Sequence, residues 1–396
     1  MKGSNLDVIE SEMTKVWAWQ RNDWGVWDVT LFADSSSLES AVRAVSRINV
    51  LSSQFTKKDK VAAEAKFLEE ESIQTSYIEG KILDRDSVRS SIARKLGILP
   101  VGHSSKHRTR DADGLIETLI DATGNYVEPL SHERLFRWQA SLFPSGRDEH
   151  GYPIEVGGYR TSSEEMKVVS ISNKGQKEFV HYIAPPSQSV HGEMERFILW
   201  FNSTSRSPNF LRAAMATYWF VSIHPFEDGN GRICRVIADM AVAQAEKSTS
   251  RLYSLSNTLI EDKHLLNRYY ETLEQCQKGT EPIDKWLGFF LDVIQASAER
   301  AEISLDDILK KVTFWDACRN TQLSERQKKY LNFVLDKGSF WKATKIDRKN
   351  YKDIVGGISP ATAKRDLQDL AGKEVLITKD TVGRNAGYEI NPELLC

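Results

Sequence analysis

Two apolar helical stretches stand almost end to end in the middle of the chain, and they constrain the fold more than any other feature. NFLRAAMATYWFVSI ends at residue 223, and a second helix is predicted to start near Asn230 and to continue through RICRVIADMAVAQ. Helices that are this apolar are typical of a buried core. The loop between them, 224–229, therefore lies where two buried helices meet.

Apolar residues recur at three- and four-residue steps, the helical spacing, through most of the remaining chain. The segments with this pattern are 37–96, 111–145 and 190–291. Gly80 suits a helix end, because glycine readily adopts the left-handed conformation found there. Asp84 or Asp86 is suited to cap the start of the next helix. The fold is therefore predicted to be mainly α-helical.

One β-hairpin interrupts the helices. KVVSI (167–171) and EFVHYI (178–183) are rich in β-branched and aromatic residues, and the connection between them contains Gly175. An isolated hairpin is only marginally stable. We therefore expect it to pack on the helices and to leave its tip free to touch a ligand.

The sequence changes character after about residue 320. One amphipathic helix and two shorter helices precede two strands around a glycine turn, which is the order of a winged helix-turn-helix. Ser359 and Pro360 suit the start of the recognition helix of such a domain. Three parts are predicted: an N-terminal arm with a helical accessory region (1–105), a central domain (106–300), and a helical linker with the winged domain (301–396).

The N-terminal stretch is rich in tryptophan. Four of the ten tryptophans are close together: Trp17, Trp19, Trp24 and Trp27. Indole rings bury large apolar areas, so we expect this arm to pack onto the helices that follow it. A peptide-binding or stacking surface is the alternative.

Composition and charge limit the class of protein. The chain has 53 Lys+Arg against 55 Asp+Glu, and a net charge of -2 excludes binding of nucleic acid along the whole length by charge alone. No apolar run approaches the roughly 18 residues that a membrane span needs. Four widely spaced cysteines predict reduced thiols: Cys234, Cys276, Cys318 and Cys396. We expect a cytoplasmic protein with no membrane partner.

The loop 224–229 and the helix after it combine features suited to phosphate binding. A helix start presents unpaired backbone N–H groups and the positive end of the helix dipole. Gly229 and Gly231 let ligand oxygens approach that backbone. Arg232 and Arg235 can bind further phosphate oxygens through their planar guanidinium groups. The pattern predicts an anion site, most simply for phosphate.

Two further side chains supply the chemistry. Asp228 is a hard carboxylate suited to a Mg²⁺ ion that bridges two phosphates. His224 titrates near neutral pH and can take a proton from a hydroxyl nucleophile. Together with the anion site, these residues indicate phosphoryl or nucleotidyl transfer.

Each of these features has a structural explanation when it is taken alone. A histidine before proline is often a packed residue, a GNG sequence is often a turn, and arginines on a helix often lie at the surface. Their fixed order at one helix start favours a functional site. Phe226 and Pro225 are assigned to structure, with the phenyl ring anchoring the loop in the core.

HPFEDGNGRICR (224–235) resembles in full the signature of the Fic family, His-x-Phe-x-Asp/Glu-Gly-Asn-Gly-Arg-x-x-Arg. The Trp-rich start, SSIARKLGI (90–98) and the C-terminal part resemble a bacterial Fic subgroup with an N-terminal accessory domain and a C-terminal helix-turn-helix. The resemblance covers most of the chain. It implies an α-helical fold, a catalytic domain at 106–300, and transfer of AMP from ATP to a hydroxyl side chain of a target protein.

The resemblance also implies a role for each residue of the motif. His224 is the general base, Asp228 holds Mg²⁺, Gly229, Asn230, Gly231 and Arg232 line the site of the α- and β-phosphates, and Arg235 meets the γ-phosphate. The Doc-type kinases carry a lysine at the position of Gly231. A glycine leaves room for the α- and β-phosphates, so nucleotidyl transfer is favoured over phosphate transfer.

TSYIEG (75–80) resembles the inhibitory motif of the family, Ser/Thr-x-x-x-Glu-Gly/Asn. A carboxylate at Glu79 can pair with Arg235 and so occupy the arginine that the γ-phosphate needs. ATP would then bind with its α-phosphate badly aligned. Two alternatives stay open: Glu79 is an ordinary acidic residue near a helix end, or it orients a water that removes AMP from a modified target.

The hairpin resembles the flap of the family, which aligns the target hydroxyl through backbone pairing along Val168, Val169 and Ser170. Tyr270 and Gln277 match positions that flank the adenine in relatives. An aromatic face and an amide suit a purine, and helical core packing is the alternative for the tyrosine.

The C-terminal part supports a second hypothesis, a transcriptional regulator that binds DNA and senses nucleotide. From residue 321 onward there are 14 Lys+Arg and 10 Asp+Glu. Lys364 and Arg365 lie on the predicted recognition helix, and Arg384 lies in the predicted wing. Asp366 and Asp369 oppose this hypothesis, because carboxylates on that helix would face DNA phosphates.

Other winged domains bind proteins or mediate dimers, and a homodimer would be ordinary for this subgroup. A scaffold with an inactive site is disfavoured, because no position of the motif is missing.

Overall fold

The computed structural model describes residues 16–27, 35–98, 109–148, 150–171, 178–204, 209–336, 345–378 and 387–395. The chain separates into two compact units. The first unit contains residues 1–45 and 64–298, and the second contains 46–63 and 299–396. The three-part division drawn from the sequence stays a prediction.

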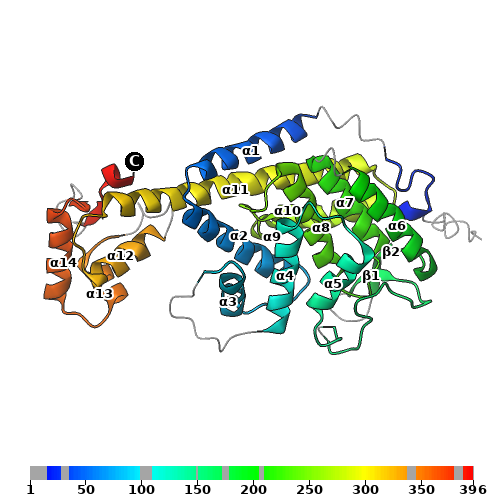
Figure 1. Cartoon of the computed structure of the whole chain (residues 1–396), viewed down its shortest axis with the longest axis horizontal. Coiled ribbons are helices and arrows are strands. Elements are labelled where there is room, and N and C mark those ends of the chain that lie inside the picture. The colour runs from blue at the N-terminus through cyan, green and yellow to red at the C-terminus, as the bar shows by residue number, and fades with distance from the viewer. Residues whose placement is uncertain are drawn as a thin grey trace, which may run out of the picture. The chain divides into compact units, whose positions relative to one another are not determined.

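Most of the described chain is helical, as predicted (Figure 1). The N-terminal elements are η1 (Ala18–Gln20), α1 (Ser36–Ser53), α2 (Lys57–Ile78), α3 (Arg85–Lys95), α4 (Arg110–Gly124) and α5 (His132–Leu142). The central elements are β1 (Lys167–Ile171), β2 (Glu178–Ile183), α6 (Ser187–Ser203), α7 (Phe210–Ile223), α8 (Asn230–Glu246), α9 (Leu255–Glu261), α10 (Lys263–Gln277) and α11 (Ile283–Ala317). The C-terminal elements are α12 (Glu325–Leu335), α13 (Arg348–Val355), α14 (Pro360–Gly372), β3 (Leu376–Thr378), β4 (Tyr388–Ile390) and η6 (Pro392–Leu395).

The core of the first unit is built around α7 and α8. Every residue of α7 is buried, and α8 is buried from Arg232 to Gln244. The two helices pack against each other, with α6 against α7 and with α4 and α5 against α8 (Figure 1). An apolar surface on all sides requires such a central position. The prediction of two buried helices is therefore confirmed.

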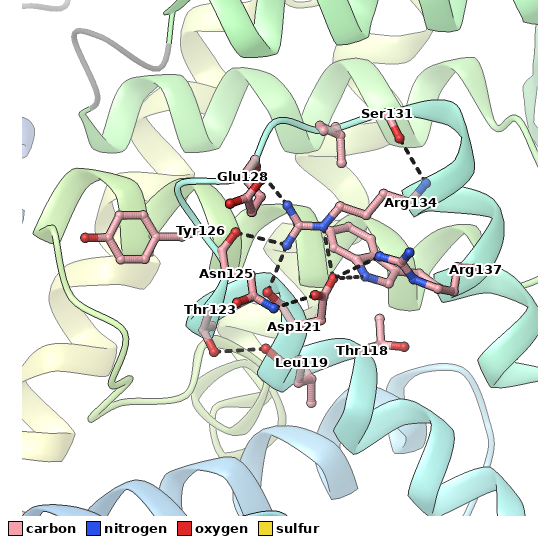
Figure 2. A network of polar contacts seen from close by, with 12 residues as sticks. Thr118, Leu119, Asp121, Thr123, Asn125, Tyr126, Glu128, Ser131, Arg134 and Arg137 are labelled. Atoms are coloured by element: carbon pink, nitrogen blue, oxygen red, sulfur yellow. Dashed lines mark hydrogen bonds and ion pairs between the residues drawn. The ribbon is translucent and has the colours of Figure 1, made fainter.

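The turn between α4 and α5 is held by a buried arginine (Figure 2). Arg134 donates from Nε to Asp121 Oδ2 at 2.9 Å, and its other nitrogens donate to the carbonyl oxygens of Asp121, Asn125 and Glu128. Trp138 Nε1 donates to the same carboxylate at 2.7 Å. The carbonyl groups at the end of α4 would otherwise lack partners. This network fixes two helices that support α8.

The hairpin forms where the sequence predicts it. β1 and β2 pair antiparallel, from Lys167 opposite Ile183 to Ile171 opposite Glu178, with a bulge between Val168 and Val169. The predicted connection with Gly175 lies outside the described residues.

The tryptophan-rich arm packs on later elements, so the expectation that it covers the helices next in sequence is wrong. The ring centroid of Trp17 lies 5.5 Å from that of Tyr182 on β2. Trp24 and Trp27 lie 6.3 Å and 5.2 Å from Trp219 on α7. Edge-to-face contacts of this kind stabilise beyond simple area burial, which explains why the rings gather there.

The second unit has its own apolar core, formed by α12, α13, α14 and the strand pair β3–β4. Its buried residues include Tyr330, Leu331, Tyr351 and Leu367. Ser359 caps α14 by accepting from the backbone N–H of Thr362, as predicted. The assignment as a winged helix stays a prediction, and Arg384 lies outside the described residues.

Of the two acidic residues on α14 that oppose DNA binding, the structure turns one away from the surface. Asp366 is buried and pairs with Arg326 at 3.1 Å, and it also accepts from the Tyr351 hydroxyl at 3.1 Å. Asp369 accepts from Gln327 and pairs with Lys373 at 2.6 Å. Asp366 is therefore turned into the domain, whereas the Asp369 side chain stays 44% exposed on α14.

Three cysteines are free thiols in the interior, as predicted: Cys234, Cys276 and Cys318. Cys396 lies outside the described residues. Among the helices that the structure describes, none is long and apolar enough to cross a membrane.

Candidate active site

The loop between α7 and α8 is held rigidly by its own residues. Asn230 donates from Nδ2 to the carbonyl oxygen of Phe226 at 2.8 Å and accepts from the backbone N–H of Phe226 at 2.9 Å. The Phe226 ring is fully buried and lies 5.5 Å from the Tyr159 ring. The prediction that this ring anchors the loop in the core is therefore confirmed.

His224 ends α7 in a left-handed conformation, with φ at 52°. Its Nδ1 lies 3.1 Å from the carbonyl oxygen of Val221. A carbonyl oxygen only accepts, so Nδ1 carries the proton and Nε2 carries the free lone pair. Burial lowers the pKa of His224 to about 4, and the positive charge of Arg160 adds to the effect. The imidazole is neutral at pH 7 and can accept a proton there.

Arg160 fixes the backbone that carries His224, and no local feature of the chain indicates this role. Its Nε donates to the carbonyl oxygen of His224 at 2.8 Å, and its backbone N–H donates to Pro225 at 2.9 Å. The side chain is buried and also donates to the carbonyl oxygen of Pro185, just after β2. This arginine therefore joins the segment after the hairpin to the loop 224–229.

The start of α8 is where the sequence predicts an anion site, and the carboxylate of Glu79 lies against it. A side-chain carbon added at Gly231 would lie 2.1 Å from Oε1 of Glu79. The first N–H groups of a helix have no partner within that helix, and the dipole is positive there. Because the Asn230 side chain is bonded to the loop, this residue can meet a phosphate only through its backbone.

Glu79 also reaches the second arginine of the motif. Arg235 Nη2 donates to Glu79 Oε1 at 2.7 Å, while the same guanidinium donates to the hydroxyl of Thr75 at 2.6 Å and to its carbonyl oxygen at 2.8 Å. Arg235 is buried, and the Glu79 side chain keeps 36% of its surface exposed. Burial acts to raise the pKa of Glu79, but Arg235 and then Arg232 outweigh it, so the pKa lies below the usual range. Glu79 is therefore ionised.

Asp228 is placed next to the first arginine of the motif. Its Oδ1 lies 3.6 Å from Nη2 of Arg232, and its side chain is 38% exposed. Arg232 lies over the ring of Phe143, 4.8 Å from the centroid. Within the described ranges, no group of three or more His, Cys, Asp or Glu residues could hold a metal ion. One exposed carboxylate still fits Mg²⁺, which is commonly held by one or two carboxylates together with substrate phosphates and water.

The residues predicted to contact adenine have different surroundings. Tyr270 is 46% exposed, and its hydroxyl lies 3.5 Å from the carbonyl oxygen of Ile78, at the end of α2. Gln277 is buried and donates from Nε2 to Ser222 Oγ at 3.0 Å. An open aromatic face near Glu79 suits a base, whereas the amide nitrogen of Gln277 is engaged by α7.

The predicted flap residues lie on β1. Val169 is 39% exposed. The Ser170 hydroxyl lies 2.7 Å from Nε2 of His181, and Nδ1 of that imidazole lies 3.0 Å from Glu274 on α10. These bonds tie the hairpin to α10, while β1 pairs only with β2 among the described strands.

The structure thus brings His224, Gly231, Arg235 and Glu79 together around the start of α8. Thr75 belongs to this group through its two bonds to Arg235. In the sequence, Thr75 is noted only as the first residue of the TSYIEG motif, and its contact with Arg235 is not predicted.

Known proteins resemble this chain over the same region. Residues 129–242 match the model of the Fic/DOC family, and residues 17–98 match a model described as a domain of unknown function (DUF4172). The chain therefore contains a Fic/DOC domain, which includes the loop and both arginines of the motif. The second match includes the tryptophan-rich arm and the helix that precedes Glu79.

Two curated relatives match about a third of the chain. A "Protein adenylyltransferase Fic" from Nematostella vectensis is 28% identical over 134 residues, which are 33% of this chain and 26% of that protein. A "Uridine 5'-monophosphate transferase" from Xanthomonas campestris pv. campestris (strain 8004) is 26% identical over 137 residues, which are 32% of this chain and 24% of that protein. The chain thus spans about a quarter of the length of these relatives.

A solved structure supports the fold. Fic-1 from C. elegans superimposes with a TM-score of 0.50 at 16% identity, covering 72% of this chain and 76% of that chain. Likeness at this identity concerns the fold alone, and it confirms the predicted Fic-type helical architecture.

Proposed function

We propose that this protein is a Fic-type nucleotidyltransferase, which moves AMP from ATP to a hydroxyl side chain of a target protein and is held inactive by Glu79. One observation carries the proposal. An ionised carboxylate lies on Gly231 and pairs with Arg235, at a helix start next to a neutral imidazole. A site that holds this carboxylate has the geometry and the charge to hold a phosphate.

The reaction follows from the placement of these groups. Nε2 of His224 takes the proton of the target hydroxyl, and the hydroxyl oxygen attacks the α-phosphorus. The bond from that phosphorus to the oxygen that bridges the α- and β-phosphates breaks, and pyrophosphate leaves. The N–H groups at the start of α8 and the guanidinium of Arg235 stabilise the charge on the phosphates. Asp228 would hold Mg²⁺, which neutralises part of that charge.

The edge of β1 is the proposed docking site for the target. An extended segment of the target pairs with Val168, Val169 and Ser170 through backbone hydrogen bonds, and this places its hydroxyl near His224. The names of the two curated relatives suggest two nucleotide substrates. One relative is named for adenylyl transfer, and the other is named for uridine 5'-monophosphate transfer. ATP is the proposed substrate, with Tyr270 against the base. Removal of AMP by a water that Glu79 orients is an alternative use of the same site.

A pair of labelled nucleotides tests the reaction type. The Glu79→Gly protein is incubated with Mg²⁺ and with ATP labelled on either the α- or the γ-phosphate, and protein-bound label and added mass are measured. Nucleotidyl transfer predicts α-label and the mass of AMP on the protein. Label from the γ-phosphate would show a kinase, and label from neither would contradict transfer. A parallel reaction with UTP tests the choice of base.

DNA binding through the second unit is a second candidate function, favoured by the inward position of Asp366. Lys364 and Arg365 of α14 are exposed, as a recognition helix requires. Replacing both with alanine in the full chain should weaken binding of duplex DNA and lower the slope of log affinity against log salt by about 2. Lys373→Ala is the matched control, because this lysine is already paired with Asp369. Fluorescence anisotropy that detects no binding at low salt would remove this function.

A further inference from the structure

A second carboxylate of α2 is deeply buried, two helical turns before Glu79. Glu71 is only 6% exposed. Its Oε2 accepts from the Ser254 hydroxyl at 2.7 Å and from the backbone N–H of Ser256 at 3.1 Å, and its Oε1 accepts from the Ser256 hydroxyl. Three donors on two oxygens make a strong attachment, because breaking any of these bonds would leave a buried polar group without its partner.

The attachment point is itself fixed. Ser254 caps α9 by accepting from the backbone N–H of Asn257 at 2.9 Å, so its hydroxyl proton is directed at Glu71. Arg251, just before it in the chain, pairs with Asp239 of α8 at 2.9 Å and lies over the Tyr253 ring. The segment that receives Glu71 is therefore tied to the helix that carries the phosphate-binding residues.

The spacing on both helices places this attachment in line with Glu79. We call Glu79 the brake, because it is proposed to hold the enzyme inactive. On α2, Glu71, Thr75 and Glu79 follow at four-residue steps, so they lie along one side of the helix and its end. On α8, Arg235 and Asp239 are also four residues apart. The two helices are thus joined at two levels, by Arg235 with Thr75 and Glu79, and by Glu71 through the segment 251–256 that pairs with Asp239.

We infer that Glu71 is a positioning residue of the brake: it anchors α2 on residues 254–256 and so holds Glu79 on Gly231 and Arg235. This inference rests on the proposed function. A flexible side chain at a helix end stays in an anion site only if the helix is held at the right position along its axis. The Glu71 bonds fix this position of α2 without touching the nucleotide site. Loss of the anchor lets the end of α2 move and opens the site to ATP.

Glu71→Gln tests the anchor with little change in shape. The amide keeps the length of the side chain, but it has no charge, and its nitrogen cannot accept from the hydroxyl or N–H that faces it. Glu70→Gln is the matched control: it is the same change on the neighbouring residue, which is only half-buried and has electrostatic neighbours rather than this set of donors. Ser256→Ala removes one donor from the other side.

Two measurements on the full chain separate anchoring from a general loss of structure. Hydrogen exchange reports opening at the end of α2, because the amides of residues 79–81 are bonded to the carbonyl oxygens of Ser76 and Tyr77. Glu71→Gln should speed this exchange and raise nucleotide transfer, each by about tenfold, within the usual range of coupling between sites. Ser256→Ala should act in the same direction, and Glu70→Gln should leave both unchanged.

Making Glu71→Gln both in the parent protein and in the Glu79→Gly protein tests whether Glu71 acts through Glu79. If Glu71 acts through Glu79, then Glu71→Gln adds nothing to transfer in the Glu79→Gly protein. Equal loss of transfer in both backgrounds would show a merely structural residue, and unchanged exchange at 79–81 would show no anchor. If the Glu79→Gly protein transfers no nucleotide at all, the proposed function fails, while the exchange measurement still decides whether Glu71 holds the end of α2.

Discussion

Replacing His224 with alanine in the Glu79→Gly protein is expected to lower nucleotide transfer by about 10²- to 10⁴-fold, the contribution typical of a general base. The physical reason is the free lone pair on Nε2, which exists because Val221 fixes the proton on Nδ1 and because burial keeps the ring neutral. Initial rates with α-labelled ATP and Mg²⁺ measure the effect.

Asparagine at the same position is the control for backbone effects. The backbone of His224 adopts the left-handed conformation. Holding an alanine in this conformation costs about 1–2 kcal/mol of folding free energy, whereas asparagine adopts it more readily. His224→Asn should therefore keep the thermal unfolding temperature closer to that of the parent protein and still lose transfer. If both variants kept transfer within about threefold of the parent, a different group would be the base.

Replacing Glu79 with glycine is expected to raise nucleotide transfer by at least about tenfold. The change removes the carboxylate from Gly231 and frees one N–H of Arg235 Nη2, while that nitrogen keeps its bond to the carbonyl oxygen of Thr75. The guanidinium keeps its place, because the hydroxyl and the carbonyl oxygen of Thr75 still accept from it. The α-phosphate can then align with His224 while Arg235 meets the γ-phosphate.

Glu79→Gln separates the charge of the brake from its bulk. The amide fills the same space but is a weaker partner for a guanidinium, so transfer should fall between that of the parent and that of Glu79→Gly. Adduct formation is followed by intact-protein mass spectrometry, with circular dichroism as a control for folding. A folded Glu79→Gly protein with no more transfer than the parent would contradict the brake.

The sequence was most informative where the determinants are local. The two apolar helices, the strands of the hairpin and the Ser359 cap follow from spacing and from single residue types, and the structure has them within a few residues. The motif residues lie on one short loop and one helix start, so the local sequence also determines that they lie close together.

What the sequence could not show depends on contacts between distant segments. Trp24 and Trp27 reach Trp219, far along the chain, and nothing local in a tryptophan indicates which apolar face it will cover. Arg160 is a single arginine that becomes important only because carbonyl groups of two other segments face it. The inward position of Asp366 cannot be inferred from its own helix, because Arg326, which pairs with it, lies on α12.

The decisive experiment is a crystal structure of the Glu79→Gly protein with ATP and Mg²⁺, which locates the triphosphate. We expect the α-phosphate at the start of α8, within reach of a hydroxyl bound by Nε2 of His224, with the γ-phosphate at Arg235 and the metal ion at Asp228. A triphosphate bound away from α8, or one whose α-phosphate lies on the far side of Arg235 from His224, would contradict this expectation.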